Sequence, residues 1–214
     1  MYKSLFIFLC LLIHITAVSG QGSWQFVTEK DGIRVFSKEV ANSKIKAIRA
    51  ECTLNSTASQ LVTLLLDIPA AEQWVFHTKS CVLLKKVSPS ELYYYSEVTL
   101  PWPLENRDFV ARIQVSQDPV TKVITVDAPA IPGWVPVKKD LVRISHSVGL
   151  WVITPLDKEH VKLEYSLQVD PGGILPAWLV NAFAAQGPLE SFKSMKEHLL
   201  LPKYRNANLP FIVN

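Results

Sequence analysis

Residues 160–170 restrict the fold more than any other segment, because apolar and polar side chains alternate there without a break. The apolar set is Val161, Leu163, Tyr165, Leu167 and Val169, and the polar set is Lys162, Glu164, Ser166, Gln168 and Asp170. Successive side chains of a strand point to opposite faces, so the segment predicts a strand with one covered face and one wet face. Such strands are typical of antiparallel sheets.

Further runs of β character occur on both sides of one helical region. Turn residues such as Asp31-Gly32 and Pro132-Gly133 separate them. We expect strands at residues 24–28, 33–40, 45–54, 81–88, 91–100, 107–117, 122–129, 140–154 and 160–170.

Two stretches change to the period of a helix. After the third strand, Ser56 or Thr57 is placed to cap a helix that runs to about Asp67, and Pro69 begins a second short helix. A long closing helix begins at Pro176, has a single apolar side and is expected to kink or break at Pro188. Residues 202–214 are expected to form an extended tail. This order predicts an α+β fold in which a strongly curved antiparallel sheet wraps around the closing helix.

The first twenty residues have the layout of a secretory signal peptide. Lys3 precedes an apolar run over Leu5–Ile13, and small residues follow at Ala17–Gly20. The apolar run is too short to span a bilayer. We therefore expect cleavage after Gly20, export, and one domain over residues 21–214. The destination would be the periplasm if the source is bacterial, and the protein would otherwise be secreted.

Two cysteines, Cys52 and Cys81, remain after the expected cleavage. An exported protein meets an oxidising compartment, which permits a disulfide. Two separate buried thiols are the alternative, because pairing depends on a distance that the sequence does not give. The net charge of +3 gives no basis for nucleic-acid binding.

Two motifs carry a family resemblance. The segment "YYYSEVTLPWPLENRDFV" (residues 93–110) places a Pro-Trp-Pro elbow before Asn106-Arg107-Asp108, and "GGILPAWLVNAFAAQGPLESFKSMKEHL" (residues 172–199) forms the closing helix. Both resemble segments of START domains, the steroidogenic-acute-regulatory-protein-related lipid-transfer family, and the resemblance covers roughly residues 24–200. It implies a helix-grip fold that encloses a hydrophobic tunnel. It also implies one bound lipid-like molecule, such as a sterol or phospholipid, with no cofactor and no metal.

The strand over residues 107–117 supplies the first candidate site residues. Arg107 and Phe109 share the side that is expected to face inward. A buried charge must find partners, so Arg107 either satisfies carbonyls at the strand end or anchors a lipid head group. The pattern does not settle which side of residues 140–154 faces inward. The candidate cavity-lining set is Trp102, Arg107, Phe109, Arg143, Trp151, Tyr165, Leu179, Phe183 and Met195.

Two other functions compete with lipid carriage or storage: an enzyme of the wider helix-grip superfamily, cyclase-like or hydrolase-like, and a partner-binding module of the cell envelope. The histidines of the mature chain have no metal-binding spacing, and the serines lack a nucleophile elbow. We therefore expect a monomeric, non-catalytic lipid-binding protein. Lys85-Lys86 and Lys138-Lys139 stand beside turns, as solvated strand ends or as points of transient membrane contact.

Overall fold

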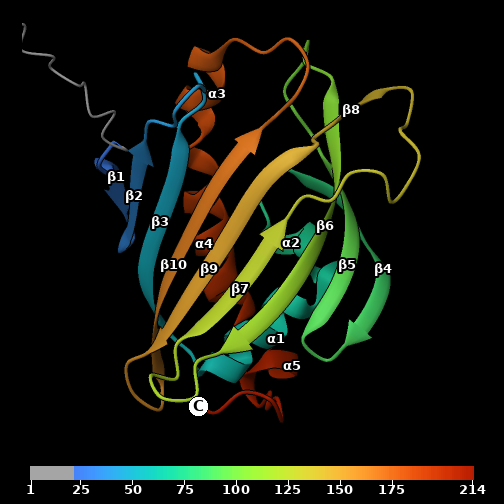
Figure 1. Ribbon diagram of the computed structural model, residues 1–214. Coiled ribbons are helices and arrows are strands. Elements are labelled where there is room, and N and C mark those ends of the chain that lie inside the picture. Colours follow the sequence, from blue (N-terminus) through green and yellow to red (C-terminus); the bar gives the residue numbers. More distant parts are fainter. Residues whose placement is uncertain (1–21) are drawn as a thin grey trace, which may run out of the picture.

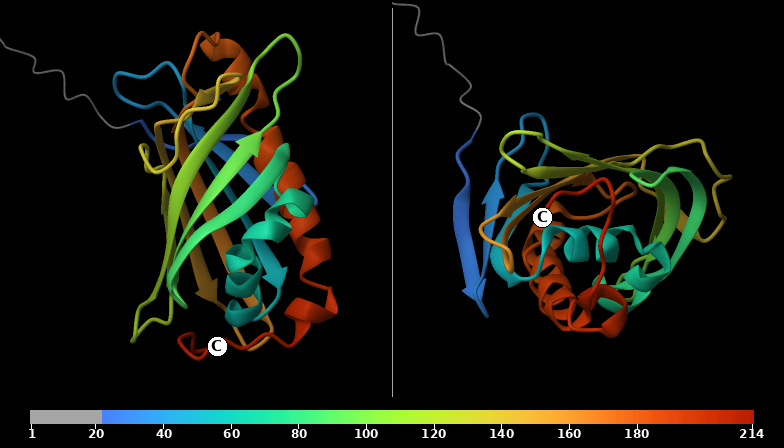
Figure 2. Two further views of the ribbon diagram at one scale, coloured as in Figure 1. Left: turned by 90° about the vertical axis from the view of Figure 1, so that its right-hand side faces the viewer. Right: turned by 90° about the horizontal axis from the view of Figure 1, so that it is seen from below.

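The computed structural model describes residues 22–214, so the expected signal peptide lies outside the described residues. Over this range a ten-stranded sheet curls around the helices (Figures 1 and 2). Nine strands lie in the order β1-β2-β3-β10-β9-β7-β6-β5-β4, and β8 pairs with β6 beside this row. The strands are β1 (Gln25–Lys30), β2 (Ile33–Lys38), β3 (Ala47–Asn55), β4 (Thr78–Ser88), β5 (Glu91–Val98), β6 (Asn106–Gln117), β7 (Ile124–Pro129), β8 (Leu141–Arg143), β9 (His146–Pro155) and β10 (His160–Asp170).

Strand β10 has the two faces that its sequence predicts. Val161 and Leu163 have 0% of their surface accessible. On the other face, Lys162 and Glu164 stay partly accessible, and their side chains form an ion pair of 2.6 Å. β10 pairs antiparallel with both β3 and β9, as expected for a sheet with one wet face.

Residues 140–154 form two strands, which corrects the expectation of one. β8 runs parallel to β6 and places Arg143 opposite Asp108, whereas β9 pairs antiparallel with β7 and β10. The amide of Ile144 donates to the carbonyl of Asp108 at 2.9 Å and so ties the chain to β6 just before β9 begins. The regular alternation of side chains between the two faces of a strand therefore does not continue from β8 into β9. As a result, Arg143 and Trp151 lie on opposite faces of the sheet.

The helices are α1 (Ala58–Leu66), the 3-10 helix η1 (Ile68–Ala70), α2 (Ala71–Trp74), α3 (Ala177–Phe183), α4 (Gln186–His198) and α5 (Pro202–Arg205). Thr57 caps α1 as expected, because its hydroxyl accepts from the Gln60 amide while the Gln60 side chain accepts from the Thr57 amide. α5 replaces part of the extended tail that was expected after residue 201. In the part of the chain that the structure describes, no helix combines the length and the apolar character needed to cross a membrane.

The closing helix is divided as expected, but upstream of Pro188. α3 ends at Phe183 and α4 begins at Gln186, so Pro188 lies in the first turn of α4, where no amide donor is needed. α4 runs along the concave face of the sheet (Figure 2). Its side chains Phe192 and Met195 are fully buried. The helix-grip arrangement thus follows from one amphipathic helix and a sheet curled around it.

Cys52 on β3 and Cys81 on β4 are buried free thiols. Burial raises their pKa values to about 11 and about 12. The structure therefore favours the second of the two alternatives that the sequence left open.

Candidate functional site

The interior is tightly packed at the end nearest α1. Ile124, Ile153 and Leu163 come from β7, β9 and β10, and their accessible surface is 0%. Phe192 and Met195 of α4 are equally buried and belong to the same cluster. This half of the interior is therefore core.

Toward the α3 end, the side chains that face inward keep some accessible surface. Tyr94 on β5, Phe109 on β6, Trp151 on β9 and Tyr165 on β10 are all only partly buried. Burial nevertheless raises the pKa of the Tyr94 and Tyr165 hydroxyls far above the usual value. These partly accessible aromatic side chains on the inner side of the sheet mark the candidate site.

Aromatic rings from several elements meet at this site. The Trp151 ring stacks on Tyr165 with centroids 4.0 Å apart and on Phe192 of α4 at 5.9 Å. Trp74 at the end of α2 meets Trp151 edge-to-face at 6.4 Å. Strand pairing explains the first contact, because Trp151 and Tyr165 are direct partners across β9 and β10. Long-range packing, not local sequence, brings Trp74 and Phe192 to the same place.

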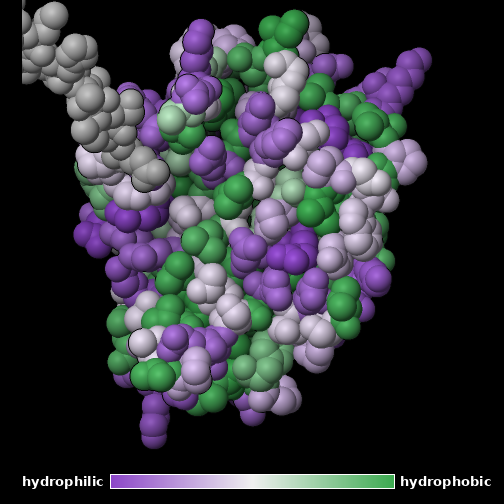
Figure 3. Space-filling model, in the orientation of Figure 1, coloured by the Kyte–Doolittle hydropathy of each residue, from purple (hydrophilic) through white to green (hydrophobic). Residues whose placement is uncertain are grey.

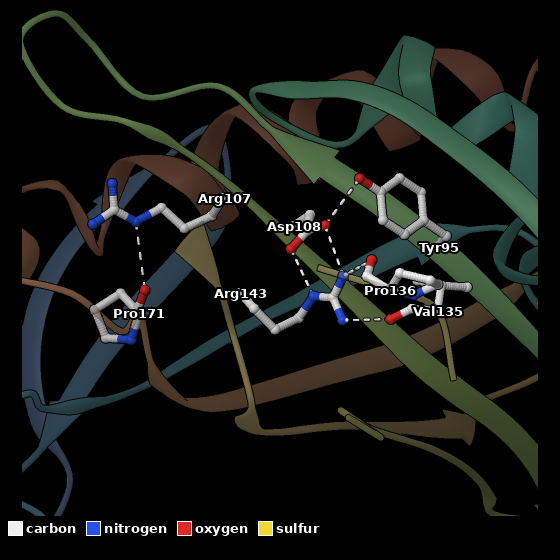
Figure 4. Close-up of polar contacts among 7 residues, drawn as sticks. All are labelled: Tyr95, Arg107, Asp108, Val135, Pro136, Arg143 and Pro171. Atoms are coloured by element: carbon white, nitrogen blue, oxygen red, sulfur yellow. Dashed lines mark hydrogen bonds and ion pairs between the residues drawn. The ribbon is translucent and has the colours of Figure 1, made fainter. Parts of the chain in front are cut away.

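Arg107 lies at the α3 end of β6 and is 4% exposed. Its guanidinium donates to the carbonyls of Glu105, Pro171 and Gly172, the last two at 3.4 Å. Figure 4 shows the bond to Pro171. Burial lowers the pKa of Arg107, while the nearby Glu105 raises it. Arg107 thus fastens the loop before α3 to the sheet, which is the first of the two roles expected from its sequence position.

A second polar cluster lies on the opposite face of β6. The fully buried carboxylate of Asp108 accepts from Arg143 Nε at 2.7 Å and Nη2 at 3.0 Å, and from the Tyr95 hydroxyl at 3.1 Å. Arg143 also donates to the carbonyls of Val135 and Pro136 (Figure 4). The hydrogen bonds with the Asp108 carboxylate raise the pKa of Arg143 above its usual value, although burial lowers it. The cluster holds the loop between β7 and β8 against the outer face of the sheet.

The end of the molecule that carries α3 exposes large apolar side chains. Ile174 is 100% exposed, and Trp178 of α3 is 71% exposed. Trp102, in the neighbouring loop between β5 and β6, is 92% exposed. Figure 1 shows α3 and this loop at the same end, and Figure 3 shows hydrophobic residues reaching the surface there among hydrophilic ones.

α3 is attached to the rest of the fold by few polar contacts. The Asn181 side chain accepts from the Lys46 amide at 3.0 Å and donates to the Lys44 carbonyl at 3.0 Å. On the chain before α3, Gly172 and Gly173 have φ values of +66° and +64°, a conformation that favours glycine. α3 therefore stands between a glycine turn and the break before α4.

The nine residues proposed from the sequence fall into three groups. Four lie on the inner side of the sheet and α4: Phe109, Trp151, Tyr165 and Met195. Two are buried or half-buried at the α3 end: Arg107 and Leu179. Three do not line the interior: Trp102 and Phe183, which are exposed, and Arg143, which pairs with Asp108. Within residues 22–214, no group of three or more His, Cys, Asp or Glu side chains is arranged to hold a metal ion.

Sequence reasoning missed three aromatic residues that pack around the candidate site, namely Trp74, Tyr94 and the core residue Phe192. The sequence could have identified Tyr94. The charged Glu97 indicates the outer face of β5, and Tyr94, three positions earlier in the strand, must lie on the opposite, inner face. No comparable signal marked Trp74, whose position depends on how α2 packs against the sheet.

Comparison with known proteins agrees with this architecture. The family model described as START domain matches residues 16–204. A phosphatidylcholine transfer protein from Mus musculus is 27% identical over 194 residues and is covered over 87% of each chain. The solved STAR-related lipid transfer protein from Xanthomonas axonopodis is 31% identical with a TM-score of 0.78, over 83% of this chain and 99% of that one.

A second solved structure, human STARD10, is 22% identical and superposes with a TM-score of 0.73 over 85% of this chain and 75% of that one, which shows the shared fold. The helix-grip fold expected from the two motifs is thereby confirmed. On the match of its residues 16–204 and the shared fold, the chain belongs to the START domain family.

Proposed function

We propose that this protein binds one lipid molecule in the α3 half of its interior and carries it, chemically unchanged, between membranes. The observation that supports the proposal most strongly is the contrast between the two halves of the interior. The α1 half is core, whereas Tyr94, Phe109, Trp151 and Tyr165 on the inner side of the other half are only partly buried. Two of the relatives named above are named as transfer proteins for phosphatidylcholine or lipid, which supports the same function.

The energetics are adequate for a carrier. Each buried methylene contributes roughly 0.8 kcal/mol, so a chain of about 16 carbons gains on the order of 10 kcal/mol before ordering costs. Such a gain allows extraction of a lipid without any covalent step.

The route of entry follows from the attachments of α3. The break before α4, the Gly172-Gly173 turn and the pair of bonds at Asn181 allow α3 to move while α4 stays packed. The exposed Ile174 and Trp178 place apolar surface beside this opening, suited to contact with a membrane.

Native mass spectrometry of residues 21–214, purified without detergent and then incubated with mixed lipid vesicles, tests the proposal. One lipid per chain, recovered intact by solvent extraction, is the expected result. A chain that stays free of adducts would refute lipid carriage. Recovery of a chemically altered lipid would instead support an enzyme.

A further inference from the structure

Strand β4 forms one free edge of the sheet. It pairs with β5 on one side, and no strand of the described chain lies beyond it (Figure 1). The amide of Cys81 donates to the side chain of Glu72 at 2.8 Å, so α2 covers the edge at that point. Residues 82–87 follow without such a cover, and all six are exposed. This part of β4 presents backbone groups that another strand can pair with.

The backbone of Leu83 points toward the free edge. Backbone groups of successive residues in a strand point alternately to its two sides, and the Cys81 amide points away from β5, to Glu72. The pairing with β5 stays regular from Cys81 to Leu83 and shifts only after Leu83. The amide and the carbonyl of Leu83 therefore also point away from β5 and are placed to pair with an added strand.

The exposed segment carries large apolar side chains on both faces of the sheet. Val82 lies opposite Tyr95 and so on the outer face, whereas Leu83 lies opposite Tyr94 on the inner face. The complete exposed apolar set of β4 is Val82, Leu83, Leu84 and Val87. Insertion of this edge into a membrane would leave its backbone groups without partners in hydrocarbon. A peptide strand would cover the same side chains and also pair with the backbone.

Two lysines follow the first apolar residues, one on each face. Lys85 lies opposite Tyr93 on the outer face, and Lys86 lies opposite Leu92 on the inner face. Neither lysine forms an ion pair with any residue of the range 22–214. β4 itself contains no acidic residue. A second copy paired edge to edge would bring lysines together without a counter-charge, whereas an acidic strand would supply one.

We infer that β4 binds an extended acidic segment of a partner protein as an additional antiparallel strand. Two adjacent acidic residues of the partner lie beside Lys85 and Lys86, and two apolar residues further along lie beside Val82 and Leu83. The antiparallel direction is the more stable one per residue. Lysines and bulges alone protect a free edge from aggregation, but that role does not account for four exposed apolar side chains. The inference goes beyond lipid carriage and does not depend on it.

A synthetic peptide tests the inference. The probe is fluorescein-labelled Thr-Glu-Glu-Thr-Val-Val-Thr with blocked ends, and its binding to residues 21–214 is measured by fluorescence anisotropy. Replacing Glu-Glu with Lys-Lys in the peptide should weaken binding at least about tenfold. Two further versions carry N-methyl groups on one or the other set of alternating backbone amides. Only the version methylated on the amides that face β4 should lose binding, because only these amides donate to the edge.

Charge reversal in the protein gives the reciprocal test. Lys85→Glu/Lys86→Glu should weaken binding of the acidic peptide at least about tenfold and should favour the Lys-Lys peptide instead. Lys158→Glu/Lys193→Glu is the matched control, because it changes the net charge equally at two exposed lysines away from β4. Lys158 lies in the turn between β9 and β10, and Lys193 lies on α4 beside the β1–β2 turn. In the wild type, the Leu83 amide should exchange its hydrogen more slowly once the acidic peptide is bound.

The other outcomes would overturn the inference. No binding of the acidic peptide up to about 1 mM would do so. Equal effects of the two double variants would show attraction by net charge alone, and binding of both methylated versions would exclude an added strand. A dimer in sedimentation that Lys85→Glu/Lys86→Glu alters would assign the edge to a second copy. Binding to phosphatidylglycerol vesicles with the same variant dependence, and none to the peptide, would assign it to a membrane.

Discussion

Asp108 and Arg143 form an ion pair inside the fold: the Asp108 side chain has no accessible surface, and two guanidinium nitrogens of Arg143 approach its oxygens at 2.7 and 3.0 Å. Parallel pairing of β8 with β6 makes the two residues direct neighbours although 35 positions separate them. The pair connects the loop between β7 and β8 to the sheet, and the stability of that loop should depend on it.

Asp108→Asn should therefore destabilise the protein strongly. The substitution leaves the Arg143 guanidinium, whose side chain is 8% exposed, without its counter-charge. We expect the free energy of unfolding to fall by about 3–5 kcal/mol, measured by urea denaturation. Asp127→Asn is the control, because the Arg112–Asp127 pair is partly exposed and longer, at 3.8 Å. Its effect should stay below about 1 kcal/mol. Equal losses in the two variants would contradict this account.

The polarity of β6 could be predicted from the sequence, but the partners of its charged residues could not. Alternation correctly placed Arg107 on the inner side with Phe109, because a strand without a bulge preserves parity. Two of the three carbonyls that hold Arg107 belong to residues 64 and 65 positions away, and only the folded chain brings them together. Arg143 was misplaced because parity does not pass through the break between β8 and β9.

Arg107→Lys tests whether Arg107 is a fastening residue or a head-group anchor. A lysine ammonium cannot reach three divergent carbonyls as the planar guanidinium does. We expect a loss of about 1.5–3 kcal/mol in the free energy of unfolding and faster exchange of the backbone amides of residues 172–175. Lipid binding should change little. A variant with wild-type stability and much weaker lipid binding would favour the head-group role instead.

The thiols of Cys52 and Cys81 should be unreactive in the native protein. Burial raises the pKa of Cys52 from 9.0 to about 11 and that of Cys81 to about 12, so at pH 8 the thiolate fraction is about a hundredfold or more below that of a free cysteine. Ellman's reagent should therefore react with residues 21–214 only after denaturation. Because both thiols bind their protons more tightly when folded, stability should decrease as the pH rises above 9.0. Rapid reaction of native protein at pH 8 would contradict this burial.

Asp67 should make the attachment of α5 sensitive to acid. Burial raises its pKa, but bonds from Lys203 Nζ at 2.9 Å and the Tyr204 hydroxyl at 2.8 Å outweigh that effect and lower the pKa below 3.8. The carboxyl group of Asp67 therefore stays ionised to a lower pH in the folded state than in the unfolded state. This stabilisation is complete above the unfolded pKa and is lost as pH falls through the lower folded value.

Comparison of the wild type with Asp67→Asn across pH 6 to 2.5 measures this contribution. The difference in the free energy of unfolding should be less than about 1 kcal/mol near pH 6, since the Asp67 side chain is 31% exposed, and should decrease as the pH falls below 3.8. A difference that grows as the pH falls would contradict the assignment.

Ile174 and Trp178 should govern the exchange of lipid with membranes. Ile174 is fully exposed before α3, Trp178 is 71% exposed on α3, and both lie where Arg107 fastens the chain to the sheet. Both side chains are exposed to water in the free protein. Their insertion into a bilayer would remove them from water and stabilise the membrane-bound state by about 1.5–3 kcal/mol each. The Ile174→Ser/Trp178→Ser variant should transfer lipid between donor and acceptor vesicles at least about tenfold more slowly. Its equilibrium lipid content should be unchanged, because neither side chain faces the interior.

Val120→Ser provides the control, since Val120 is 84% exposed in the loop after β6, at the opposite end of the molecule. If Val120→Ser slows lipid transfer equally, or if the double variant keeps the wild-type rate, then another surface of the protein contacts the membrane.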